Sequence, residues 1–374
     1  MPVVDAPPLL PPALVAPASR EVSFGHVTGT VPPGTRRVIV RVGERLLADR
    51  PLRGRRFSVS VALPPREVTV RVTAVTATGR RASSVAERVF GLPRAAAPRA
   101  VTGRADAVLA RKLRALSRPF PGTSAFYLQD LRRGHGAAWN AGARFPAAST
   151  LKLAIAVTVL ARQDGKPELG SQLDRLLHAM IVKSDNDAAN ELEVWLGGST
   201  AAGSAHVNQT MWSLGMQDSR MYGGYESSPL RRLIDPVLDD PAPIPIRVES
   251  APSFGVGKHT SAADLATLLR AVYFAAGRSG LLPRLGVTPS EARYLLWLLA
   301  KVPDRAKLGR FLGGGVTLLH KAGWLATARH DAGIVFWPGG AFVATVMTWR
   351  PDGLGRSGDV LAGRVAAEAL RRFR

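Results

Sequence analysis

The chain has no cysteine among its 374 residues. Disulfide-stapled scaffolds, cysteine-ligated zinc sites and thiol nucleophiles are therefore excluded. Glycine and proline, 37 and 28 residues, follow no strict period, which excludes a collagen-like chain. Hydrophobic residues make up 46% and charged residues 21%, a balance typical of folded globular proteins rather than disordered ones. The length suffices for about two or three domains.

Lysine is scarce: 8 lysines accompany 42 arginines, and the net charge is +22. Such a charge is compatible with a polyanionic partner. The arginines are scattered, however, and Arg53, Arg55 and Arg56 form their tightest cluster. The aromatic pattern that single-strand binding requires is missing as well. We therefore expect no nucleic-acid partner.

Long hydrophobic runs are also rare. The longest uncharged stretch, 332–349, has the length of a membrane span, but Pro338-Gly339-Gly340 interrupts it. Two β-rich runs around such a turn predict a hairpin, so we expect no transmembrane segment. Residues 1–20 are proline-rich and lack a basic start, which predicts a tail rather than a recognisable signal peptide.

Residues 21–92 alternate between apolar and polar side chains. Val38, Val40 and Val42, for example, are separated by Ile39 and Arg41, a pattern typical of strands with one buried face. About six or seven short strands in this segment predict a small all-β Ig-like sandwich. A linker rich in alanine, proline and arginine is expected over 93–105, before a second domain over 106–374.

The second domain combines strands at both ends with helices between them. We expect a hairpin over 126–140 and a buried helix over 151–161 that is apolar almost all round. This order predicts an α/β (α+β) domain with helices around an antiparallel sheet. Further helices are expected at 171–182, 187–196, 204–214, 261–276, 290–300 and 359–373, and late strands at 316–322, 330–337 and 341–349.

Three short motifs carry candidate chemistry. Ser149-Thr150-Leu151-Lys152 is S-x-x-K at the start of the buried helix, and chance produces about 0.5 such matches in this composition. Ser184-Asp185-Asn186 is rarer, with about 0.01 chance matches. Lys321-Ala322-Gly323 follows on a predicted strand.

Each motif also has a purely structural interpretation. Ser149 and the Ser184 motif could be helix N-caps, and Lys321 a solvated lysine on a strand edge. Lys152 could extend its ammonium group toward water, but its predicted helix has no polar face. The order and settings of the three motifs together favour a catalytic set.

The three motifs resemble the S-x-x-K, S-D-N and K-T-G set of serine β-lactamases and penicillin-binding proteins. The sequences around them are similar to those of class A β-lactamases: FPAASTLKLAI, MIVKSDNDAANELEVWLGG and KAGWLATARHDAGIVFWPGG. The resemblance covers about residues 106–374. It implies a serine β-lactamase-like domain behind the Ig-like module, with no cofactor.

The resemblance implies a reaction. Ser149 would attack a β-lactam or D-Ala-type amide and become acylated. Because Ser149 opens a helix, the partial positive charge of the helix N-terminus favours the negative charge that develops there. Lys152, one turn along the same face, would accept the Ser149 proton, since burial lowers the pKa of an ammonium group.

The resemblance also assigns the remaining machinery. Ser184 would relay a proton to the departing nitrogen, and Asn186 would hold the substrate amide. The late strand would supply positive charge for the substrate carboxylate and, with the Ser149 N–H, an oxyanion hole at the Trp324 N–H. These strand residues are Lys321, Ala322, Gly323 and Trp324.

Two departures from the family pattern bear on turnover. Ala322 replaces a Thr or Ser, and the lost hydroxyl costs on the order of 1 kcal/mol of binding. The loop Glu and Asn that place the deacylating water in class A enzymes have no clear counterpart. Glu226 stands near the place of that Glu, but Leu230 occupies the Asn position, and a solvated loop carboxylate is the favoured interpretation of Glu226. Unranked alternatives are Asp235, Asp239, Asp240 and Glu249.

We therefore expect a monomeric, extracytoplasmic serine hydrolase, with a β-lactam or cell-wall peptide as substrate and slow deacylation. One alternative is a penicillin-binding D-Ala peptidase of the cell wall. Another is a non-catalytic envelope protein whose sandwich binds an anionic cell-wall polymer, since residues 20–104 carry 17 arginines and five acidic residues.

Overall fold

The computed structural model describes residues 8–223 and 244–374. The chain forms two compact units that divide between Ala95 and Ala96, within the segment expected to be a linker. Each unit is described by itself.

The N-terminal unit is all-β. One sheet has three strands in the order β1-β3-β6, and the other has five in the order β2-β8-β7-β4-β5. Their bounds are β1 Ala13–Ala16, β2 Val22–Ser23, β3 His26–Thr30, β4 Thr35–Val42, β5 Arg45–Pro51, β6 Arg56–Ser60, β7 Glu67–Thr76 and β8 Arg81–Gly91.

The alternating pattern read from the sequence builds the core of this unit. Val38 and Val40 from β4 are buried together with Val27 from β3 and Phe57 from β6, so side chains of both sheets share one cluster. The expected tail over 1–20 is corrected at one point. Ala13 pairs with Thr30 in an antiparallel ladder, which makes residues 13–16 part of a sheet. An Ig-like assignment of the unit stays a prediction.

A six-stranded sheet forms the centre of the second unit. The strand order is β14-β15-β16-β10-β11-β9, and every pairing is antiparallel except β11 with β9. Strand β9 lies inside the expected linker, so the end of that segment belongs to this sheet. The bounds are β9 Arg104–Ala105, β10 Thr123–Asp130, β11 His135–Trp139, β14 Thr317–Leu325, β15 Ala328–Trp337 and β16 Gly340–Trp349.

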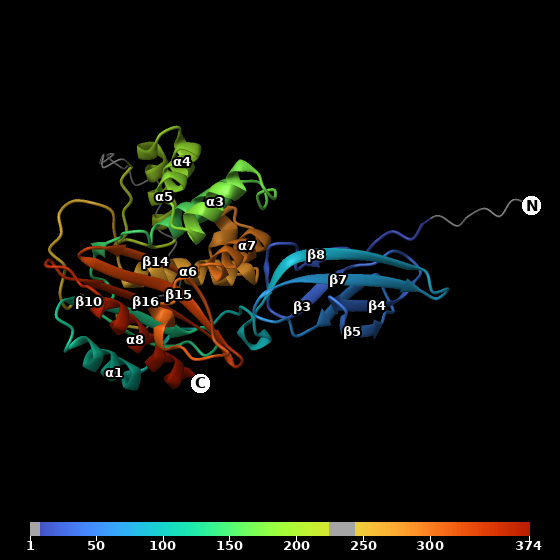
Figure 1. Ribbon diagram of the computed structural model, residues 1–374, viewed down its shortest axis with the longest axis horizontal. Helices are drawn as coiled ribbons and strands as arrows, with labels where there is room; N and C mark the ends of the chain where they lie inside the picture. Colours follow the sequence, from blue (N-terminus) through green and yellow to red (C-terminus); the bar gives the residue numbers. More distant parts are fainter. Residues whose placement is uncertain (1–7, 224–243) are drawn as a thin grey trace, which may run out of the picture. The chain divides into compact units, whose positions relative to one another are not determined.

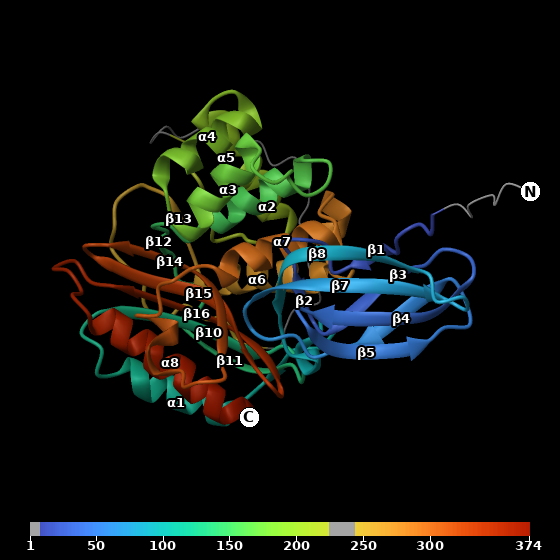
Figure 2. The same ribbon diagram turned by 45° about the vertical axis from the view of Figure 1, so that its right-hand side comes forward.

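Helices cover both faces of this sheet (Figures 1 and 2). On one face α1 and α8 pack against the sheet around Phe126, Phe342 and Val365. On the other face α6 crosses β10, β15 and β16, and α7 packs on α6. The helices are α1 Ala107–Ser117, α2 Lys152–Arg162, α3 Gln172–Val182, α4 Asn186–Gly197, α5 Thr200–Ser213, α6 Ala262–Ala276, α7 Pro289–Ala300 and α8 Ser357–Phe373.

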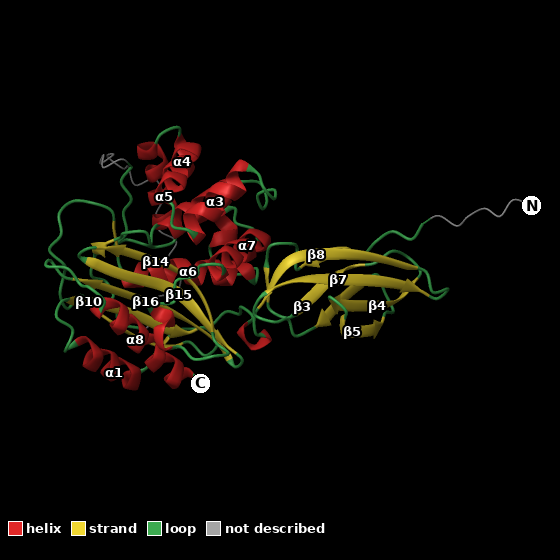
Figure 3. Cartoon of the chain, viewed as in Figure 1, coloured by secondary structure: helices red, strands yellow, loops and turns green. Residues whose placement is uncertain are grey.

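The late hairpin expected from the Pro-Gly-Gly turn is confirmed: Trp337 of β15 pairs with Gly340 of β16. Helix α5 begins at Thr200, four residues before the expected start, because the Ser199 side chain accepts from the Ala202 N–H and caps it there. Figure 3 shows the strands at the centre of the unit and the helices outside them. In the part of the chain described, no helix combines the length and the apolar composition of a membrane span.

Candidate active site

A short two-stranded ladder holds the segment before Ser149. Strand β12 (Phe145–Pro146) pairs with β13 (His259–Thr260), and the Ala147 N–H donates to the Lys258 carbonyl at 2.8 Å. The Thr150 hydroxyl donates back to the Ala147 carbonyl at 2.6 Å. Ala148 has a φ of +48°, a conformation that L-residues rarely adopt. The tight turn leaves Ser149 half-buried, three residues before α2, where it lines a cavity of about 630 Å³. The expectations that Ser149 opens the helix or caps it are corrected, because α2 begins at Lys152 and its N-cap is Leu151, without a side-chain cap.

Lys152, the first residue of α2, extends its side chain away from water and is 7% exposed. Its Nζ donates to the Ser184 carbonyl at 2.5 Å and to Asn186 Oδ1 at 2.6 Å. Burial lowers the pKa of Lys152 to about 8; Asp185 opposes this shift and the charge of Lys258 adds to it. The snorkelling interpretation of Lys152 is therefore wrong, and the ammonium group sits between the first two motifs.

The three residues of the Ser184-Asp185-Asn186 motif make different contacts. Asp185 caps α4, because its carboxylate accepts from the Ala188 N–H at 2.8 Å. Ser184 has a φ of +60°. Such a backbone conformation costs on the order of 1 kcal/mol or more and persists where the surroundings impose it. The N-cap interpretation therefore holds for Asp185, whereas Ser184 and Asn186 contact the buried lysines.

Lys321 lies on the edge strand β14, yet it is 2% exposed. Its Nζ donates to Ser184 Oγ at 2.8 Å and to the Ala322 carbonyl at 2.9 Å. Burial lowers the pKa of Lys321 to about 7, and the neighbouring charge of Lys152 lowers it further. The interpretation of Lys321 as a solvated edge lysine is thus wrong.

Gly323 and Trp324 bring β14 against the start of α2. A Cβ at Gly323 would lie 2.9 Å from the Ser149 backbone nitrogen and 3.1 Å from Ala148 Cβ, so only glycine permits this approach. Trp324 is 64% exposed and lines the cavity. Ala322, between Lys321 and Gly323, is half-buried.

His330 on β15 fixes the same region from behind. It is fully buried, and burial lowers its pKa to about 4, so the imidazole is neutral near pH 7. Its Nε2 lies 2.8 Å from the Pro146 carbonyl oxygen, and its Nδ1 accepts from the Thr348 N–H at 3.3 Å. This contact joins the sheet to the turn that precedes Ser149, and no motif in the sequence signals it.

The loop carboxylates divide into two groups. Glu226, Leu230, Asp235, Asp239 and Asp240 lie outside the described residues. Glu249 is described and exposed: its backbone N–H donates to Asn140 Oδ1 at 2.7 Å, and its side chain does not line the cavity.

Glu193 is a cavity residue that sequence reasoning missed. It is 1% exposed and is the one carboxyl side chain lining this cavity among the residues that the structure describes. The Ser204 hydroxyl donates to its Oε1 at 2.8 Å, and burial raises the pKa of Glu193. The available signal was its spacing, since Glu193 stands seven residues after Asn186, on the same face of α4.

Lysines dominate the charge of the site. Lys152 and Lys258 line the cavity, and Lys321 contacts Ser184 beside it. Three close ammonium groups with one buried carboxyl make a potential that favours an anionic ligand, such as one bearing a carboxylate. The geometry thus combines a serine hydroxyl in the turn before a helix, a lysine able to lose its proton near neutral pH, and a bridging serine.

The family model described as "Beta-lactamase enzyme family" matches residues 108–169 and 162–373. The chain belongs to the β-lactamase enzyme family. No curated protein matches the chain. The match begins after the N-terminal unit, so it concerns the second unit alone.

Solved structures of this family share the fold. The structure of PBP-A is 23% identical, covers 73% of this chain and 98% of its own, and has a TM-score of 0.54. The ancestral class A β-lactamase GNCA is 21% identical, with 71% and 100% covered and a TM-score of 0.53. A β-lactamase from Sphaerobacter thermophilus is 21% identical, with 72% and 98% covered and a TM-score of 0.51. A PBP-A variant has been solved as an acyl-enzyme complex with penicillin G.

Proposed function

We propose that this chain is a serine acyl-transfer hydrolase that is acylated at Ser149 by β-lactams or D-Ala-type amides. One observation carries the proposal: the Lys152 ammonium group lies between the Ser184 carbonyl and Asn186 Oδ1, while Lys321 donates to Ser184 Oγ. These contacts connect all three motifs in one proton-transfer network beside the cavity that Ser149 lines. A purely structural origin of the motifs does not account for two buried lysines without a carboxylate partner at this point.

In the acylation step, neutral Lys152 accepts the proton of Ser149 as Ser149 Oγ forms a bond to the substrate carbonyl carbon. With a pKa of about 8, roughly a tenth of Lys152 is neutral at pH 7. The backbone N–H groups of Ser149 and Trp324 stabilise the oxyanion. The C–N bond then breaks, and the departing nitrogen takes the hydroxyl proton of Ser184. The Lys321 ammonium group then donates a proton to the Ser184 oxygen.

Substrate binding uses the other side of the network. Asn186 holds the amide of the substrate, and Lys321 attracts its carboxylate. Gly323, which has no side chain, lets β14 come close to the Ser149 backbone. Ala322 offers no hydroxyl to that carboxylate, which weakens binding by on the order of 1 kcal/mol.

Deacylation is the slow step in this proposal. A water must attack the acyl carbon and lose a proton, and the chain has no asparagine between residues 216 and 258 to hold it. Asn186, Asn190, Asn140 and Asn208 are the four asparagines of the chain, and Asn208 is engaged with both backbone polar groups of Met221.

The test is the intact mass of the full chain after incubation with benzylpenicillin or a cephalosporin, beside a Ser149→Ala control. A persistent adduct on the wild type alone supports both the nucleophile and slow deacylation. Lactam hydrolysis with no adduct would overturn slow deacylation, and neither adduct nor hydrolysis would overturn lactam recognition.

A second candidate is a D-Ala peptidase of the cell wall, favoured by the missing loop asparagine and by the fold shared with PBP-A. Release of D-alanine from a D-Ala-D-Ala peptide separates it from a lactamase. In either case we propose an extracytoplasmic, monomeric protein, and retention of its Ig-like unit on an anionic wall polymer is tested by salt-sensitive binding.

A further inference from the structure

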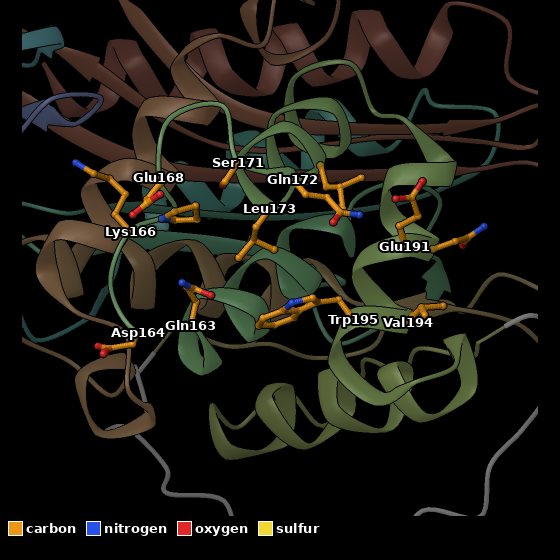
Figure 4. Close-up of a pocket in the computed structure, with 13 residues that line it drawn as sticks. Gln163, Asp164, Lys166, Glu168, Ser171, Gln172, Leu173, Glu191, Val194 and Trp195 are labelled. Carbon is orange, nitrogen blue, oxygen red and sulfur yellow. The ribbon is translucent and has the colours of Figure 1, made fainter.

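A second cavity of about 860 Å³ lies beside the catalytic one, with which it shares Asn190. Figure 4 draws the residues that line it. Its walls come from the end of α2, the segment that leads into α3, the first turns of α3 and the exposed face of α4. Asn190 lines both cavities, so the two are neighbours at that side chain. None of the three motifs contributes to the second cavity, and the proposed reaction does not use it.

Helix α4 connects the two cavities. Asn186, Asn190 and Val194 are spaced by four residues and therefore lie on one face of the helix. Asn186 lines the catalytic cavity and Val194 the second one. Eight residues of α-helix put Val194 about 12 Å beyond Asn186 along the axis. A substrate bound at Asn186 can therefore reach the second cavity only through a branch of that length.

The second cavity exposes a large aromatic side chain. Trp195 is 46% and its neighbour Val194 45% exposed, although both belong to a helix that buries its opposite face. Exposed large apolar side chains in a concave site mark a binding surface. In Figure 4 the indole of Trp195 lies among the lining side chains, with Leu173 above it and Gln163 to its left.

Polar side chains surround this indole. Gln163, Gln172 and Asn190 provide amide donors and acceptors, and Ser171 adds a hydroxyl group. Carboxylates and one lysine stand on both sides: Lys166 and Glu168 on one, Glu191 on the other (Figure 4). A flat apolar surface framed by amides and carboxylates is complementary to a ring with an apolar face and polar groups at its edge.

We propose that the second cavity binds a sugar ring of a glycan chain whose attached peptide reaches Ser149. The sugar would place its C–H face on Trp195 and its hydroxyl and N-acetyl groups against Gln163, Gln172 and Asn190. The inference rests on the proposed function for the identity of the peptide substrate, while the sugar contact itself requires no acylation. It narrows the substrate class to glycan-linked peptides rather than small free amides.

The experiment measures binding of chitotriose, a β-1,4-linked trimer of N-acetylglucosamine, to the full chain by calorimetry. We expect the wild type to bind it, and Trp195→Ala and Gln172→Ala to weaken binding at least tenfold and about threefold. Trp324→Ala is the matched control, because this exposed tryptophan lines the catalytic cavity and should leave sugar binding unchanged. The rate of acylation by benzylpenicillin is measured on the same variants. We expect Trp195→Ala to stay within twofold of the wild-type rate, because Trp195 does not line the catalytic cavity.

The outcomes are separable. The sugar site is overturned if the wild type does not bind chitotriose, or if Trp195→Ala binds it as tightly as the wild type. It is also overturned if the cavity binds 1,5-diaminopentane and not the sugar, because its carboxylates would then select a cation. Sugar binding that depends on Trp195 in a protein that penicillin does not acylate would leave the sugar site standing and overturn the proposed reaction instead.

Discussion

The two faces of β14 bury polar side chains with different partners: a carboxylate on one face and neutral oxygens on the other. On one face His320 lies against Asp331, with Nδ1 2.7 Å from Oδ1, and Asp331 also accepts from the Leu308 N–H at 3.1 Å. On the other face the adjacent Lys321 donates to Ser184 Oγ at 2.8 Å, and burial and the charge of Lys152 lower the pKa of Lys321 while the charge of Asp331 opposes the shift.

The contrast separates a structural pair from a chemical one. The carboxylate of Asp331 contacts the His320 ring and accepts from the Leu308 N–H, so both of its oxygens have a partner and the loop is held to the sheet. Lys152 and Lys321 receive only neutral oxygens, and burial lowers the pKa of both lysines toward neutrality. A fold keeps such unpaired charge at a cost in stability, so the second face is where function is expected.

The largest effect should come from Lys152→Met, which removes the proton acceptor. We expect the rate of acylation by benzylpenicillin to fall about a thousandfold, within the range for loss of a general base. Time-resolved intact-mass measurements check this. Lys112→Met is the control, because Lys112 lies on the exposed side of α1 beside Glu368 and should leave the rate unchanged. A rate within tenfold of wild type for Lys152→Met would remove Lys152 from the mechanism.

A substitution on the face of the sheet that carries His320 and Asp331 should lower the stability of the fold and leave the acylation rate nearly unchanged. Asp331→Asn leaves His320 and the Leu308 N–H with a weaker acceptor in a buried site, so the free energy of unfolding should fall by about 2–3 kcal/mol. Urea denaturation measures this loss. Acylation per folded molecule should change less than threefold, and a larger drop would show that the two faces are coupled.

The pH dependence should sharpen the comparison on the chemical face. Lys152 must be neutral to accept a proton, so the acylation rate should rise about tenfold per pH unit below its pKa of about 8 and level off above it. Lys321 must be charged to attract a carboxylate, so binding should weaken as pH rises above its pKa of about 7. Single-turnover acylation over pH 5.5–9.5 gives both limbs. Loss of the low-pH limb without a shift in substrate affinity would contradict these roles.

The smallest effect concerns the departure at the strand. Ala322→Thr restores a hydroxyl beside Lys321, and one added hydrogen bond to the substrate carboxylate should raise kcat/KM about fivefold. Ala326→Thr, at an exposed position after the end of β14, is the matched control with no expected gain. Equal values for the two variants would mean that the carboxylate does not lie at Ala322.

Much of the fold was predictable because local pattern and tertiary packing agree. The nearly all-apolar run over 151–161 forms the buried helix α2, and the Pro-Gly-Gly turn joins β15 to β16. Pairings without a local signal were missed: β1 and β9 are short, lie in proline-rich or alanine-rich segments, and form only against strands from elsewhere in the chain. Long-range pairing of so few residues leaves no periodicity to detect.

The sequence by itself determined the motifs, their order and the helix and strand that carry them, because each depends on neighbours within a few residues. Only the tertiary structure decided that Lys321 is buried, that Lys152 and Lys321 meet at Ser184, and that Glu193 enters the same cavity. Burial and the pKa shifts it causes depend on what packs around a side chain, and those neighbours lie tens to more than a hundred residues away in the chain.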